Sequence, residues 1–145
     1  MLDEAGARLT RRRGGRLLVP RGEVSLVVDA WDHIDGNLPR SRLGLYSLAF
    51  QRLHADAMPV AGFEPPRPAI EFARLPGADQ VKTVYSDKSG ITVQGSAETH
   101  FRYSIAGGLA ATTALPAGDY LLRMVAKDFP GNAATRGRDL SVRVY

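Results

Sequence analysis

The chain has 145 residues, 44% of them hydrophobic, and a formal net charge of +4; this size and composition fit one domain with a hydrophobic core. It contains no cysteine, which excludes a disulfide framework, a thiolate zinc site and a cysteine nucleophile. No run of about 18 apolar residues is present and the N-terminus is polar and rich in arginine, so the sequence predicts neither a transmembrane helix nor a signal peptide.

The first residues are charged and end in two glycines, which predicts a flexible basic arm over residues 1–15 and a single β-sandwich domain over residues 16–145. Six arginines lie in or near this arm: Arg8, Arg11, Arg12, Arg13, Arg16 and Arg21. They could bind nucleic acid, but no aromatic residues are interleaved with them. We therefore interpret the segment as a solvated tail and expect no nucleic-acid partner.

Alternating hydrophobic residues predict short strands along the rest of the chain. The expected strands cover residues 16–19, 23–31, 43–53, 70–74, 80–85, 91–94, 100–105, 120–127 and 140–144, and a short helical turn is expected at 110–114. Several prolines between the third and fourth strands predict a long central loop over about residues 54–69. Short strands separated by glycine and proline turns indicate an all-β fold, an antiparallel β-sandwich.

The stretch from Leu115 to Val144 has the clearest pattern. It begins with L-x-x-G-x-Y, which ends at Tyr120, and continues through a strand into the turn sequence D-F-P-G-N. In that turn Gly131 supplies a positive φ, and the side chains of Asp128 and Asn132 bond nearby backbone groups. Turn chemistry alone explains these residues, so their expected role is structural; a calcium site at Asp128 and Asn132 is the alternative.

A resemblance to the last two strands of immunoglobulin-like and fibronectin type III-like sandwiches of bacterial extracytoplasmic proteins rests on Leu115, Gly118, Tyr120, Ala126, Asp128, Gly131 and Asn132. The resemblance implies an immunoglobulin-like fold. It also implies that Tyr120 forms a tyrosine corner, in which the hydroxyl bonds back to the preceding loop.

The first half of the chain is similar to the β-sandwich region that accompanies the peptidase domain of some bacterial M23-type (lysostaphin-like) metallopeptidases. The similar residues are the strand Val24 to Asp29, then Asp32, and an L-G-x-Y-x-L strand at Leu43, Gly44, Tyr46 and Leu48. The peptidase's own zinc motifs, H-x-x-x-D and H-x-H, are missing. The resemblance therefore implies a non-enzymatic accessory or interaction module of a periplasmic or extracellular cell-envelope protein. Its loops 32–42 and 54–69 would face a neighbouring peptidase domain, another protein or a cell-wall polymer.

Other candidate sites leave two further functions open. The loop residues Asp29, Asp32, Asp35 and Asn37 carry the oxygen ligands that calcium prefers, but their spacing is not that of an EF-hand, so no cofactor is assigned. Trp31 and Phe63 are the aromatic residues expected to be exposed, and they make a carbohydrate-binding module the first alternative. The second is a hydrolase with an unrecognised carboxylate pair, which would come from Glu23, Glu64, Glu71 and Glu98.

Overall fold

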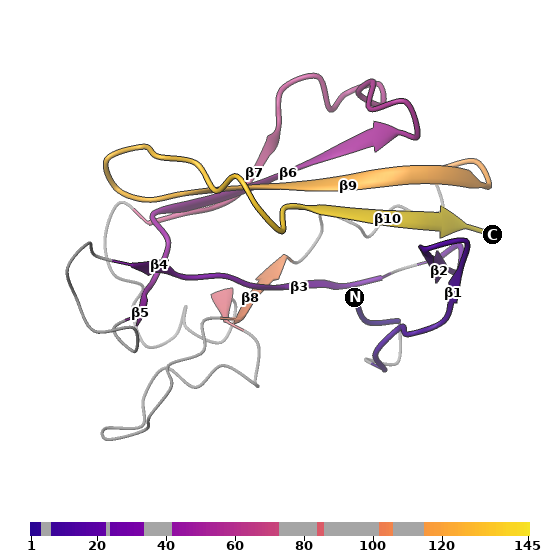
Figure 1. The fold of residues 1–145 in the computed structure, drawn as a ribbon, viewed down its shortest axis with the longest axis horizontal. Helices are drawn as coiled ribbons and strands as arrows, with labels where there is room; N and C mark the ends of the chain where they lie inside the picture. The colour runs from indigo at the N-terminus through magenta and orange to yellow at the C-terminus, as the bar shows by residue number, and fades with distance from the viewer. Residues whose placement is uncertain (4–6, 23, 34–41, 73–83, 86–101, 106–114) are drawn as a thin grey trace.

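The computed structural model of the chain describes residues 1–3, 7–22, 24–33, 42–72, 84–85, 102–105 and 115–145. Every element named in these residues is a strand, so the described part of the chain is all-β, as predicted. Figure 1 shows two layers, a long sheet and a shorter pair of strands beneath it. No helix in these ranges is long and apolar enough to cross a membrane.

The large sheet has six strands in the order β1 (Arg12–Arg13), β2 (Arg16–Val19), β10 (Asp139–Val144), β9 (Gly118–Lys127), β6 (Ser47–His54) and β7 (Arg67–Glu71). The second layer contains β3 (Leu26–Asp29) paired with β8 (Arg102–Ile105), and a further short pair joins β4 (Asp32–His33) to β5 (Arg42–Leu43). The expectation of a purely antiparallel sandwich is wrong, because β2 runs parallel to β10 with Leu17 opposite Val142. Alternation along a strand predicts which face is buried, but not the direction of the neighbouring strand.

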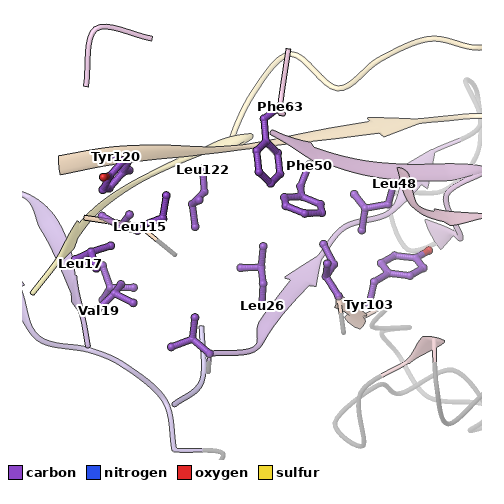
Figure 2. Close-up of a cluster of buried hydrophobic side chains, with 14 of the residues drawn as sticks. Leu17, Val19, Leu26, Leu48, Phe50, Phe63, Tyr103, Leu115, Tyr120 and Leu122 are labelled. Carbon is purple, nitrogen blue, oxygen red and sulfur yellow. The ribbon is translucent and has the colours of Figure 1, made fainter. Parts of the chain in front are cut away.

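The hydrophobic core lies between the large sheet and the β3–β8 pair (Figure 2). Leu48 of β6 and Leu122 of β9 are each 1% exposed and point toward Leu26 and Tyr103 of the opposite layer. Tyr103 is 0% exposed, and its hydroxyl accepts a hydrogen bond from the Leu45 N–H at 2.8 Å. This bond fixes the entry to β6 against the second layer.

The N-terminal residues predicted as a flexible arm are paired with the sandwich where the structure describes them. Leu2 exchanges two backbone hydrogen bonds with Ser25, at 2.8 and 2.9 Å, and β1 pairs with β2. Met1 and Leu9 pack against the core. The charge of this segment suggested a free arm, but its few apolar side chains are enough to attach it.

The central segment, residues 54–69, is more ordered than its prolines suggested. β6 continues to His54, and β7 contains Pro68. Proline is compatible with this strand because β7 is the last strand of the large sheet within the described residues, where an outward N–H has no partner strand to bond. Between the two strands the chain folds back on β6, and the Val60 N–H donates to the Arg52 carbonyl at 3.0 Å.

The C-terminal strands form the hairpin that the sequence predicts, with Val142 opposite Tyr120. The Tyr120 hydroxyl donates a hydrogen bond to the Pro116 carbonyl at 3.0 Å, which is the bond expected of a tyrosine corner. Of the remaining expected elements, the strand at 91–94 and the helical turn at 110–114 lie outside the described residues, as does most of the strand at 80–85.

Candidate functional site

A groove of about 440 Å³ opens on the outer face of the large sheet, where β6, β7 and the β9–β10 turn meet. Its walls include Tyr46, Ala49, Pro66, Pro68, Val125 and Phe129. The groove lies on the outer face because alternate residues of β9, such as Leu122 and Ala126, are buried in the core, which turns Val125 and Lys127 outward. Its volume is within the range of small-molecule and ligand sites.

Two aromatic rings form the most distinctive wall of the groove. The rings of Tyr46 and Phe129 meet edge to face, with their centroids 5.4 Å apart and their planes at 90°. Phe129 is 82% exposed. The Tyr46 hydroxyl donates to Glu71 Oε1 across 3.4 Å, a long and therefore weak hydrogen bond. The groove thus combines an exposed aromatic face with a polar group within its walls.

The turn that carries Phe129 is held by its own polar side chains. The Asn132 N–H donates to Asp128 Oδ1 and the Asn132 amide Nδ2 donates to Asp128 Oδ2, both at 2.7 Å. The Gly131 N–H donates to the Asp128 carbonyl at 3.2 Å, and the Asp128 N–H donates to the Asn132 carbonyl at 3.1 Å. Gly131 has a φ of 97°, which favours glycine. The Asp128 side chain thus bonds a backbone N–H as predicted, whereas the Asn132 side chain bonds the Asp128 carboxylate and not a backbone group.

The same bonds decide what the carboxylate of this turn can do chemically. Hydrogen bonding by the Asn132 side chain is the largest of the causes that lower the pKa of Asp128. A carboxyl group that donates a proton to a leaving group needs a raised pKa. Asp128 is therefore unsuited to be the general acid of a hydrolase.

Phe63 is buried, so its predicted exposure is wrong. It is 5% exposed, and its ring lies beside Phe50, with the centroids 5.6 Å apart (Figure 2). The guanidinium groups of Arg52 and Arg67 lie 4.7 and 4.2 Å from its centroid. Gln51 of β6 holds the loop that contains Phe63 against the strand, because its Nε2 donates a hydrogen bond to the Phe63 carbonyl at 2.8 Å. A proline-rich sequence indicated a surface loop, but not which of its side chains returns to the core.

Trp31 is 44% exposed, as predicted, but it is not part of the groove's lining. Sequence reasoning missed Phe129, the most exposed large hydrophobic residue of the described part of the chain. Tyr46 is two residues before the buried Leu48, so regular alternation would place it on the core face, but the chain bends at Tyr46 before β6 begins and Tyr46 lines the groove. The available signal was the position of Phe129 inside a turn sequence, where a phenylalanine has no core to enter.

The structure describes two of the four candidate calcium ligands, Asp29 and Asp32, and each has a different neighbour. Asp29 Oδ2 lies 3.4 Å from Arg102 Nε, and Asp32 lies in β4 opposite Leu43. Asp35 and Asn37 lie outside the described residues. Among the residues the structure describes, no group of three or more His, Cys, Asp or Glu side chains is placed to hold a metal ion.

Comparisons of this chain with protein-family models, with curated proteins and with solved structures find no significant match.

Proposed function

We propose that the chain is a non-catalytic interaction module of a bacterial cell-envelope protein, and that it holds a cell-wall polymer in the groove beside Phe129. The observation that carries the proposal is the exposed ring of Phe129 on a turn fixed by the Asp128–Asn132 hydrogen bonds. An exposed aromatic on a rigid turn loses little conformational entropy when a partner covers it, which is the property of an interface anchor.

The immunoglobulin-like character of the fold belongs to the same proposal. In this proposal the neighbours β10, β9 and β6 of the large sheet are assigned to the G, F and C strands of such a sandwich, and the β3–β8 pair to its B and E strands; the strand order is compatible with that assignment. The Tyr120 hydrogen bond supports this assignment. The sequence resemblance to the sandwich that accompanies M23-type peptidases extends the proposal to a periplasmic or extracellular location and to a peptidase domain as neighbour.

A carbohydrate-binding module is the second candidate, and the exposed Phe129 face favours it, because sugar rings stack on aromatic faces while polar side chains orient them. In the groove Glu71 and Tyr46 provide those polar groups. A polymer built of sugars satisfies both candidates, which then differ only in whether other polysaccharides compete for the groove.

The test is cosedimentation of the purified chain with insoluble peptidoglycan. We expect Phe129→Ala to weaken binding by at least about tenfold, as loss of an interface anchor does. Met58→Ala is the matched control. Met58 is 62% exposed and lies just after His54, the last residue of β6. The strand runs seven residues, or roughly 24 Å, from Ser47 in the groove to His54, so Met58 lies away from the groove.

Equal binding by the wild type and both variants would refute the role of the groove. No binding by the wild type would refute the polymer as partner. Soluble glucans and chitin fragments added as competitors distinguish the two candidates, because a general carbohydrate-binding module is displaced by at least one of them.

A further inference from the structure

The outer face of the large sheet also carries a basic strip, which we define as Arg11, Arg13, Arg16 and Arg143. Gly14 and Gly15 both have positive φ, 57° and 77°, as a two-residue type I′ hairpin turn requires. The turn places Arg13 directly opposite Arg16. The Leu18 N–H donates to the Arg11 carbonyl at 2.8 Å, so Arg11 lies opposite Leu18.

Strand alternation puts these arginines on one side of the sheet. Leu17 and Val19 are buried in the core, so Arg16 and Leu18 face outward with their cross-strand partners. In the next strand Arg143 lies opposite Leu18. The basic strip therefore spans β1, β2 and β10 on the face that also bears the groove.

One carboxylate lies within this strip among the described residues. Asp119 accepts two hydrogen bonds from Arg143, at 2.6 and 2.8 Å, and lies 3.2 Å from Arg16 Nε. Hydrogen bonding by Arg143 is the largest cause that lowers the pKa of Asp119, so this carboxylate stays ionised. Its single charge balances one of the two arginines, while Arg11 and Arg13 extend the positive charge to the sheet edge and are both exposed.

The opposition of Arg13 and Arg16 has an energetic cost, since like charges directly opposite each other on one face destabilise a strand pair. An anion placed over the pair removes that repulsion. Guanidinium groups bind phosphate and carboxylate oxygens through paired hydrogen bonds, which makes such an anion the chemically complementary ligand.

The basic strip and the groove lie at opposite ends of one track along β9. In Figure 1 β2 lies beside the end of β10, and the β9–β10 connection lies at the other end of that strand. Asp119 and Val125 are six residues apart on β9, a separation of roughly 20 Å. A ligand that reaches both must be an extended polymer.

We propose that the outer face binds a linear polymer carrying phosphodiester groups, with one ring of the polymer in the groove and its phosphates over the basic strip. This inference rests on the proposed function and names the chemical class of its partner. Nucleic acid is the less favoured polyanion. Proteins that bind single strands stack successive bases on aromatic side chains that lie within the basic groove itself. Here the aromatic residues of the groove lie at the opposite end of β9 from the basic strip.

The experiment compares two preparations of peptidoglycan, one that retains its covalently attached phosphodiester polymer and one from which acid has removed it. We expect the wild type to bind the first about tenfold more tightly at low ionic strength, with most of that difference lost at about 0.5 M salt. The double variant Arg11→Gln/Arg13→Gln should lose the difference and keep the Phe129-dependent binding to the stripped preparation. The control Arg136→Gln/Arg138→Gln removes the same charge from exposed positions near the start of β10 and should behave as the wild type.

The outcomes separate this inference from the function on which it rests. Equal binding to both preparations with Phe129 still required would overturn the polyanion inference alone. Absence of binding to either preparation would overturn the proposed function. Tighter binding to a single-stranded DNA oligonucleotide than to the phosphodiester-bearing peptidoglycan, lost in the same double variant, would overturn the inference in favour of nucleic acid.

Discussion

Substitution of Tyr103 by phenylalanine tests the polar contact at the centre of the core. The Tyr103 side chain is 0% exposed, and its hydroxyl accepts the N–H of Leu45, a residue that is itself 8% exposed. Removal of the hydroxyl leaves that N–H without this acceptor, in a place where bulk water does not replace it. The contact spans 58 residues of sequence and joins the two layers, so its loss affects the global unfolding of the sandwich.

A buried donor left unsatisfied costs about 1–3 kcal/mol, and we take about 2 kcal/mol for this site. The entropy of unfolding near the melting temperature is about 2.1 cal/mol/K per residue, or about 0.3 kcal/mol/K for this chain of 145 residues. The expected fall in melting temperature is the ratio of the two, about 7 °C.

Thermal and urea unfolding followed by circular dichroism measure both quantities. The matched control is Tyr46→Phe, which removes a hydroxyl bonded at 3.4 Å to Glu71 on the groove and should cost less than about 0.5 kcal/mol. Equal destabilisation by the two substitutions, or a loss below about 0.5 kcal/mol for Tyr103→Phe, would refute the reasoning from the buried N–H.

Four further outcomes are expected. Burial raises the pKa of Tyr103 to about 12 from 10.0, so the unfolded chain releases this proton at a lower pH than the folded chain. The free energy of unfolding should therefore fall from pH 10 toward 12, by at most about 1.4 kcal/mol per pH unit. Urea unfolding should show this slope in the wild type and a smaller one in Tyr103→Phe. Phe63→Ala should cost about 3–5 kcal/mol in the same assay, and a loss below about 1 kcal/mol would contradict the place of this ring in the core. Gly131→Ala should cost about 1 kcal/mol in the same assay. The cost comes from the φ of 97°, because the added methyl group meets no atom within 4 Å, and a neutral effect would show that the turn adopts another conformation. Millimolar calcium should leave the melting temperature unchanged because the carboxylate of Asp29 pairs with an arginine, and a rise of more than about 2 °C would restore the calcium alternative.

The sequence predicted the elements in which hydrophobic alternation is regular. The strands around Leu26, Leu48, Tyr103 and Leu122 alternate as predicted, and these four side chains are buried. The Tyr120 bond was predicted from resemblance and is present. These features depend on local sequence, and the alternation of hydrophobic and polar residues predicts them directly.

Features that depend on contacts distant in sequence could not be predicted. The burial of Phe63 results from the return of a loop onto β6, and the parallel direction of β2 results from pairing with a strand more than a hundred residues later. The groove likewise combines Tyr46 with Phe129, which are brought together by the pairing of β6 with β9. Local patterns contain no information about such partners.

The parallel pairing of β2 with β10 has a mechanical consequence when the described chain is stretched from its two ends. The last residue, Tyr145, donates its N–H to the Val19 carbonyl at 3.1 Å and accepts the Arg21 N–H at 3.0 Å. Tension along the chain pulls β2 toward its start and β10 toward its end, so the two strands are loaded in shear and their hydrogen bonds resist together. Once the Leu2–Ser25 bonds and the short β1 hairpin have separated, this pair bears the force.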